Sequence, residues 1–409
     1  MSYPDLDIDL TDEQKAMRDM ARKFGMEVMR PLGIELDNMA DPADVIADGS
    51  PLWDVFKQYR ELGLHKRAMP KAFGGMLEDM DRLSGLLVSE EFGYADSGLA
   101  ISLGVAGHPF RYAALSDDPE LQGWARDYCE DTECSMIGCW AITEPDHGSD
   151  WISGPQPDFN DPKSGPSLKA VKKGDEYILN GQKSAWVSDG TIATHATLHV
   201  NLDPSKGMHG SAICILPLDL PGISKGKPLN KIGQRALNQG EIFFEDVKIP
   251  KKYMVVPDPT VSQRGLKVIF TGANTGMSVL FGGLAKAAFD EALKYSKERI
   301  QGGVPIFEHQ NIKLKLMDMF NKVEAARSLS RRVSAYNAAN LPGSIPHAMA
   351  AKCRSTEAAF QVASEAIQIF GGNGLSKEYP IEKIFRDAKA SMIEDGENSA
   401  LALTGAAFL

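Results

Sequence analysis

The segment SMIEDGENSAL, residues 391–401, brings three carboxylates, Glu394, Asp395 and Glu397, together around Gly396. A carboxylate held away from bulk water can remove a proton from carbon, because burial raises its pKa toward neutral pH. The same cluster could also be the solvated, charged end of a helix. The elements that surround the segment decide between these two interpretations.

A second cluster is AITEPDHGSD, residues 141–150, which places Thr143, Ser149 and several acids directly after a strand-like run. Such a loop can offer hydroxyls and backbone N–H groups to a phosphate or to the polar edge of a ring. An ordinary turn without a ligand fits these residues equally well. The chain has no G-x-G-x-x-G, Walker A, G-x-S-x-G or H-E-x-x-H motif, which argues against nicotinamide, P-loop, hydrolase and zinc-protease sites.

No metal site is expected. Cys129, Cys134 and Cys139 recur every five residues, which is not a zinc spacing, and a free cysteine usually behaves as a small buried hydrophobe. His195 and His199 would share one face of a strand, but no carboxylate ligand accompanies them.

Composition restricts the partners. The 409 residues are 43% hydrophobic and 24% charged, as in an ordinary globular protein, and the net charge of −11 argues against nucleic acid. No run of 18 apolar residues predicts a membrane span, and the acidic start MSYPDLDIDLTDEQ resembles neither a secretion signal nor an organelle presequence. Five cysteines fit a reducing compartment, so we expect a cytoplasmic protein.

Hydrophobic periodicity divides the chain into three regions. Residues 1–135 have helical spacing, with Thr11 as the N-cap of the first helix. Residues 136–250 consist of strand-like runs, and residues 251–409 return to long amphipathic helices. The predicted fold class is α+β, with an N-terminal helical domain, a central β domain and a C-terminal helical bundle.

Turn signals refine the β region. The run LKAVKKGDEYILNGQKSAW predicts a hairpin that turns at KKGDE, and Asn180–Gly181 predicts a further turn. Residues 154–167, GPQPDFNDPKSGPS, are rich in Pro, Gly and Asp and predict a long exposed loop.

Four motifs in order across the chain resemble those of the acyl-CoA dehydrogenase family: AITEPDHGSD, GDEYILNGQKSAW, KERIQGGVPIFEHQ and QIFGGNGLSKEYPIEKIFRDAK. The resemblance spans nearly the whole chain. It implies a helical domain, a small β-barrel and a C-terminal four-helix bundle, in a homotetramer that binds FAD between barrel and bundles.

The resemblance also assigns cofactor-binding residues. Two β-region segments match those that line the flavin: Trp140, Ile142, Thr143 and Ser149, and then Trp186, Val187 and Ser188. Residues of the C-terminal region match those that reach the FAD of a neighbouring subunit: Arg299, Gln310, Gln368, Ile369, Phe370, Gly371 and Gly372. The glycines suit this role, because a backbone without Cβ allows a pyrophosphate to approach closely.

The opening segment then takes a role by resemblance. The family has I-Y-E-G-T here, and aligning the preceding R-D-A-K places Asp395 at the Glu that removes the α-proton of the acyl thioester. Asp is shorter by one methylene, so Glu394 and a loop without a base remain alternatives to Asp395. Some members carry the base at the position of Gly276, where this chain has no carboxylate. Ser149, Asn274 and Gly396 fall at substrate-contacting positions.

Several further positions depart from the family pattern. Asn274 and Met277 replace the Asp and Arg of a D-x-x-R motif whose Arg contacts CoA, and Gly302 replaces a Phe. KSAW is one residue longer than the usual K-x-W, and the 154–167 loop is longer than typical. Asp96 borders the expected acyl pocket, where a capping or solvent-facing role is favoured over that of a second acid.

The resemblance implies an FAD-dependent acyl-CoA dehydrogenase of the kind found in fatty acid metabolism. Such an enzyme would form an enoyl-CoA and pass electrons to an electron-transfer flavoprotein. The departures from the family pattern, where a Phe and an Arg are missing, predict a branched, cyclic or bulky acyl group. Two alternatives stay open at this point. One is a nitroalkane-oxidase-like or monooxygenase-like flavoenzyme of the same fold, and the other is a non-catalytic partner subunit.

Overall fold

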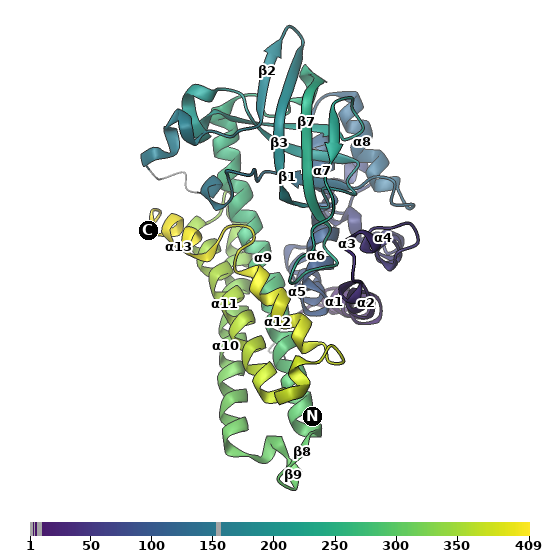
Figure 1. The fold of residues 1–409 in the computed structure, drawn as a ribbon, viewed down its shortest axis with the longest axis vertical. Coiled ribbons are helices and arrows are strands. Elements are labelled where there is room, and N and C mark those ends of the chain that lie inside the picture. The colour runs from purple at the N-terminus through teal and green to yellow at the C-terminus, as the bar shows by residue number, and fades with distance from the viewer. Residues whose placement is uncertain (1–2, 4, 6–9, 153–156) are drawn as a thin grey trace.

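The computed structural model describes residues 3, 5, 10–152 and 157–409. The molecule is elongated, with the β domain at one end and a long helical bundle that ends in a small hairpin at the other (Figure 1). The N-terminal helices lie along the side of this assembly (Figure 1). The three regions therefore follow one another as the hydrophobic periodicity predicts.

The N-terminal region is helical. Thr11 caps the first helix through a capping box with Gln14, as predicted, and a π-helical turn at Gly25–Met29 joins the first two helices. Asp41, Ser50, Asp81 and Asp118 each cap a later helix with their side chains. The helices are α1 Asp12–Phe24, α2 Arg30–Asn38, α3 Pro42–Val45, α4 Pro51–Glu61, α5 Arg82–Ala95, α6 Ser97–Val105, α7 His108–Ala114 and α8 Pro119–Glu130.

The central region is a curled seven-stranded sheet in the order β1-β4-β2-β3-β7-β6, with β5 paired to β4. Its strands are β1 Gly138–Ala141, β2 Lys169–Lys173, β3 Glu176–Ser188, β4 His195–Asn201, β5 Ser211–Pro217, β6 Ile223–Lys225 and β7 Gln239–Pro250. The inner face forms a core of its own, which also takes in Phe110 of α7 and Tyr128 of α8. These two helices thus pack on the β domain.

The hairpin prediction is half right. β2 and β3 pair antiparallel across Gly174, as the KKGDE signal predicts. The predicted turn at Asn180–Gly181 is wrong, because β3 continues through both residues to Ser188. Gly181 has φ +136° at a register shift against β7, and Asn180 exchanges hydrogen bonds with Asp246. The Asn-Gly pair therefore predicts a positive φ correctly, but the positive φ forms a β-bulge and not a turn.

The loop prediction for residues 154–167 is also only partly right, over the part that the structure describes. Pro157–Asn160 and Pro162–Ser164 form short 3-10 turns. Phe159 is buried with Trp151 and Met208, so this segment packs on the body of the protein. Residues 153–156 lie outside the described part of the chain.

The C-terminal region is a bundle. Its helices are α9 Pro259–Glu298, α10 Gln310–Ala339, α11 Ile345–Phe370, α12 Ile381–Ser391 and α13 Asn398–Ala406, and the hairpin β8 Ile300–Gln301 with β9 Val304–Pro305 joins α9 to α10. The bundle and the N-terminal helices share one hydrophobic core, to which Val88, Phe281 and Val323 contribute.

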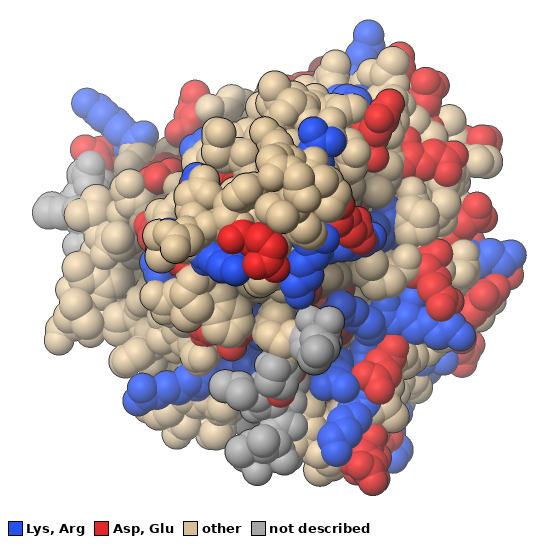
Figure 2. Space-filling model, turned by 90° about the horizontal axis from the view of Figure 1, so that it is seen from below, with Lys and Arg blue, Asp and Glu red and all other residues tan. Residues whose placement is uncertain are grey.

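Among the described residues, α9 alone has the length and apolarity to cross a bilayer. Because 67% of its most apolar window is buried inside the protein, it fits a core helix of the bundle. The surface carries mixed charge: viewed from the β8–β9 end, acidic and basic side chains are interspersed (Figure 2).

Candidate active site

The loop between α12 and α13 is an ordered turn and not a frayed helix end. Asp395 has φ +51° and Gly396 has φ +100°, and Glu397 caps α13 by accepting from the backbone N–H groups of Ser399 and Ala400. A Cβ on Gly396 would lie 2.8 Å from Ile152 Cδ1 and 2.9 Å from Leu401 Cδ2. Only glycine fits this position, on grounds of both backbone conformation and space.

Three distant segments hold this loop in place. Ser149 Oγ of the β domain accepts a hydrogen bond from the Glu397 N–H at 2.9 Å. Lys352 Nζ of α11 donates to the Gly396 carbonyl at 2.8 Å. Gln234, which precedes β7, donates its Nε2 to Glu394 Oε1 at 2.7 Å. The acidic loop therefore lies at the junction of the β domain and the bundle.

Both neighbouring acids of the loop have raised pKa values. Burial, and then the charge of Asp395, raise the pKa of Glu394 to about 7, although Gln234 and nearby lysines act in the opposite direction. Burial also raises the pKa of Asp395, and Lys352 opposes that rise. The Glu394 side chain is held by Gln234. Burial thus favours the protonated form of both acids, and because their charges interact they titrate as a pair.

The first β-domain segment reaches the same junction. The Trp140 ring stacks on His108 with centroids 5.2 Å apart, and its Nε1 donates to His199 Nε2 at 2.9 Å. The Ile142 carbonyl accepts from the buried Lys183, and the Thr143 carbonyl accepts from the Ser184 N–H. Ser149 touches the acidic loop directly, so this segment links the predicted flavin contacts to the carboxylates.

The second β-domain segment lies at the end of β3. The extra residue of KSAW falls in an irregularity of the β3–β7 register between Lys183 and Val187. Trp186 is 58% exposed, whereas Val187 is 1% exposed and faces the core. Val187 can therefore offer only its backbone to a cofactor, while the Trp186 ring is free to contact one.

The side chains of Lys231 and Gln239 connect the end of β3 to the start of β7 and the segment before it. Gln239 Nε2 donates to the Trp186 carbonyl and to Ser188 Oγ, at 3.3 Å each. Lys231 Nζ in turn donates to Gln239 Oε1 at 2.8 Å. Burial lowers the pKa of Lys231 to about 8, and Glu394 is the nearby charge that most opposes this.

The remaining predicted cofactor residues lie elsewhere. Gln368, Gly371 and Gly372 are exposed near the end of α11, and Arg299 and Gln310 are exposed on either side of the β8–β9 hairpin. This is the end of the bundle away from the β domain (Figure 1). A single chain therefore does not bring this set to the acidic loop.

Ile369 and Phe370, unlike the neighbouring Gln368, Gly371 and Gly372, are buried. They are 6% and 5% exposed, and Phe370 stacks on Tyr295 with ring centroids 4.0 Å apart. Gly371 has φ +62°, and a Cβ on Gly371 or Gly372 would meet no atom within 4 Å. The two glycines leave the open space that close approach of a phosphate group requires.

Asn274 offers no charge to a ligand. It is fully buried on α9, and its Nδ2 donates to the Phe270 carbonyl of the preceding turn. Phe270 packs against Trp151 and Ile152, so this face of α9 adjoins the β-domain loop. A Cβ at Gly276 would meet no atom within 4 Å, which leaves space beside α9 at that position.

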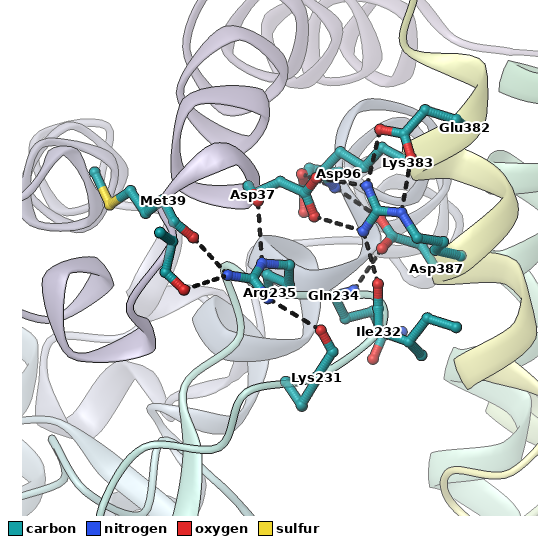
Figure 3. A network of polar contacts seen from close by, with 12 residues as sticks. Asp37, Met39, Asp96, Lys231, Ile232, Gln234, Arg235, Glu382, Lys383 and Asp387 are labelled. Carbon is teal, nitrogen blue, oxygen red and sulfur yellow. Dashed lines mark hydrogen bonds and ion pairs between the residues drawn. The ribbon is translucent and has the colours of Figure 1, made fainter. Parts of the chain in front are cut away.

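Asp96 is a helix cap, as favoured from the sequence, but it does not face solvent. Its Oδ1 accepts from the Leu99 N–H at 2.9 Å at the start of α6. Its Oδ2 lies 2.7 Å from Lys383 Nζ, and that nitrogen also lies 2.6 Å from Asp387 Oδ2 (Figure 3). The buried cation thereby joins α6 to α12.

A polar network extends from this ion pair to the acidic loop. Asp387 accepts from the Gln234 N–H, so the residue that holds Glu394 is itself held by α12 (Figure 3). Arg386 pairs with Asp37 of α2 and Glu382 of α12, and Arg235 donates to the Asp37 carbonyl. The network fixes α12 and the 231–235 segment against the N-terminal helices.

The histidines and cysteines take structural positions. His199 is buried and accepts from Trp140, and burial lowers its pKa to about 3. Cys129 and Cys139 are buried, and Cys134 is partly so, all as free thiols. Within the described residues no group of three potential ligands is placed to hold a metal ion.

The residues at the junction fit a flavin. A ring needs an aromatic face and polar groups along its edge. Trp186 supplies an exposed indole, and the two β-domain segments carry the hydroxyls of Thr143 and Ser188. The Thr143 carbonyl accepts from Ser184, one residue after Lys183 on β3, so both β-domain segments meet here.

Sequence reasoning missed Gln234, Lys231, Lys352 and Lys383. These residues contact segments that are distant in the sequence. One sequence pattern, a lysine on the apolar face of a helix, could have indicated two of them. Lys352 and Lys383 each stand on the apolar face of a predicted helix, where an unpaired lysine is costly. A lysine at such a position implies a buried acceptor from elsewhere in the chain.

Family models match the chain in order: "Acyl-CoA dehydrogenase, N-terminal domain" over residues 11–114, the middle domain over 139–247 and the C-terminal domain over 264–409. The probable acyl-CoA dehydrogenase YngJ of Bacillus subtilis is 32% identical over 400 residues, 96% of either chain. Cyclohex-1-ene-1-carbonyl-CoA dehydrogenase of Syntrophus aciditrophicus is 29% identical over 95% of this chain and 88% of its own.

Solved structures of similar fold support the same family. Butyryl-CoA dehydrogenase from Megasphaera elsdenii superposes with a TM-score of 0.84 at 29% identity, over 98% of this chain and 99% of its own. A chain of the structure described as the electron transferring flavoprotein of Acidaminococcus fermentans gives a TM-score of 0.82 at 29% identity, over 98% of either chain.

Proposed function

The chain belongs to the acyl-CoA dehydrogenase family of FAD-dependent oxidoreductases, and on this premise we propose that Asp395 is the base that removes the α-proton of its acyl-CoA substrate. The arrangement of the 394–397 loop supports this assignment. The loop is fixed at the junction with the β domain, and burial raises the pKa of Asp395. The oxidase, monooxygenase and non-catalytic alternatives are not favoured, since the relatives are acyl-CoA dehydrogenases.

FAD, when bound, accepts the β-hydride, and the protein supplies proton removal and positioning. Trp186, Ser188 and Thr143 would hold the ring at the β-domain edge. Within the described part of the chain, the backbone N–H groups of Asp395 and Gly396 donate to no protein acceptor. They are available to a thioester carbonyl, and such donors stabilise the negative charge that develops on that oxygen as the α-proton leaves.

We extend the proposal to a branched, cyclic or bulky acyl group. The open space at Gly276 and the missing charge at Asn274 and Met277 support a pocket that differs from the family pattern. The relative from Syntrophus aciditrophicus, which is named for a cyclic acyl group, supports the same class. An electron-transfer flavoprotein is the proposed electron acceptor, supported by the Acidaminococcus structure. Assembly as a homotetramer would bring the cofactor residues at the far end of the bundle, such as Arg299 and Gln368, to the FAD of a neighbouring subunit.

The test is anaerobic bleaching of the flavin absorbance at about 450 nm by acyl-CoA thioesters, with straight-chain and cyclic substrates compared. Asp395→Asn should lower the bleaching rate by about 10²- to 10⁴-fold while FAD stays bound, because a general base contributes that much. Glu394→Gln is the matched control and should retain bleaching. The opposite pattern would transfer the role to Glu394, and unchanged bleaching in both variants would reject a base in this loop.

A further inference from the structure

Lys352 occupies an unusual position for a lysine. It lies in the middle of α11 with no exposed surface, among Ala348, Ala351 and Ser355 on the buried side of the helix. Its Nζ donates to the Gly396 carbonyl at 2.8 Å and to Asn398 Oδ1 at 3.1 Å. A buried ammonium is costly unless it is paired, so its position implies a function at the loop it touches.

Further contacts between α11 and Asn398 also fix the end of the loop. Asn398 Nδ2 lies 3.0 Å from Thr356 Oγ1, one turn after Lys352, and Cys353 Sγ contacts the Asn398 carbonyl at 3.4 Å. One face of α11 therefore binds both the carbonyl of Gly396 and the residue that begins α13. Rotation of the Gly396 peptide would break the contact with Lys352 and would redirect the neighbouring Asp395.

The charges around the loop come from several elements. Lys352 of α11 and Lys231 before β7 act on Glu394 as cations, and Lys352 also acts on Asp395. Facing Lys352 are Glu394, Asp395, Glu397 and the Cys353 thiol, while Lys231 also faces Asp387 and Asp189. Burial lowers the pKa of Lys352, and the loop carboxylates oppose that change.

We propose that Lys352 is a positioning residue that fixes the conformation of the 394–398 loop through the Gly396 carbonyl and, as a buried cation at that loop, favours the charged form of its carboxylates. The second part rests on the proposed role of Asp395, whereas the first part does not. A cation near a carboxylate favours its charged form, which is the form a base needs. The same ammonium orients the peptide through a charge-assisted hydrogen bond, which is stronger than a neutral one.

Lys352→Met tests both parts in the FAD-loaded protein. Hydrogen exchange of the backbone in residues 393–399 should become faster by about tenfold or more, because a hydrogen bond to a charged group is lost. The acid limb of the pH profile for anaerobic flavin bleaching should move to higher pH by about one unit, since loss of the cation raises the carboxylate pKa.

Two further variants make the test decisive. Lys286→Met removes another buried lysine, which is 8% exposed and pairs with Asp290 within α9, and should leave both readouts unchanged. Lys352→Gln keeps a donor without the charge, so it should move the pH profile with a smaller effect on exchange. If Lys352→Met cannot be isolated folded, Lys352→Gln supplies the pH shift alone.

The outcomes separate this inference from the proposed function. Exchange in the 393–399 segment that equals that of the Lys286→Met control, together with an unmoved pH profile, would overturn the role of Lys352. Persistent bleaching in Asp395→Asn would instead overturn the base assignment, and the exchange result for Lys352→Met would still stand.

Discussion

Replacing Lys383 by Met should destabilise the protein strongly, because it leaves two acids in a buried site. Lys383 Nζ lies 2.7 Å from Asp96 and 2.6 Å from Asp387, and both aspartate side chains are only 2% exposed. Burial alone would lower the pKa of Lys383, but the charges of Asp387 and Asp96 raise it overall. The wild-type cation therefore stays charged and opposes the effect of burial on Asp387, whose pKa is still raised overall.

The loss in the free energy of unfolding can be estimated from the way in which the variant avoids a buried unpaired charge. One carboxylate can take up a proton, and protonation from an ordinary pKa of about 3.9 at pH 7 costs about 4 kcal/mol, since each pH unit corresponds to about 1.4 kcal/mol. This agrees with the roughly 3–5 kcal/mol found when one partner of a buried ion pair is removed.

The sign of the pH dependence follows as well. In the variant the folded pKa of the retained acid pair lies above the unfolded value, so the folded state holds an extra proton. The deficit relative to wild type is then small below the unfolded pKa and grows as pH rises from about 4 to 7. At pH 5 it should be about 1.5 kcal/mol.

Urea unfolding of the FAD-loaded protein at pH 5 and pH 7 measures this deficit. The control is Lys71→Met, which removes an exposed lysine paired with Asp79 on the surface and should leave the urea midpoint unchanged. Adding Asp387→Asn to Lys383→Met should restore part of the stability. A Lys383→Met midpoint equal to that of the control, or a deficit independent of pH, would refute the reasoning.

Two other substitutions give distinct results. Gly396→Ala should slow anaerobic bleaching with FAD still bound, because φ +100° and the contact with Ile152 at 2.8 Å force the loop to move; an unchanged rate would contradict this. Asp189 is buried, and burial raises its pKa well above the ordinary value. Asp189→Asn should therefore raise the urea midpoint relative to wild type at pH 7 but not near pH 4, and a lower midpoint at pH 7 would contradict the raised pKa of Asp189.

The fold was predictable where local signals agree with the tertiary structure. Thr11 begins its helix because its hydroxyl and Gln14 satisfy the free N–H groups of the first turn. The change from a helical period to alternating residues marks the β domain, because buried positions repeat differently on a helix and on a strand. The Asn180–Gly181 prediction failed because a positive φ serves a bulge as well as a turn, and the sequence does not distinguish the two.

The site was predictable only through resemblance, and only in part. The acids at 394–397 and Ser149 were recognised from motifs, but the side chains that hold them were not. Gln234 is 160 residues from Glu394, and Lys352 is 44 residues from Gly396. Such contacts depend on how helices and sheet pack, which periodicity does not specify. Lys383 was missed for the same reason, since Asp96 lies 287 residues away.

The conformation of the loop offers a reason for Asp at position 395. Its backbone lies in the left-handed region at φ +51°, which Asp adopts more readily than Glu because its short polar side chain can bond locally. For Asp395 to act as the proposed base, the position of the loop must compensate for the lost methylene. Ser149, Lys352 and Gln234 fix the loop from three sides, so it cannot follow a ligand without losing one of these contacts. In the proposed mechanism the acyl group must therefore approach the acid, because the loop cannot move toward the acyl group without breaking one of these contacts.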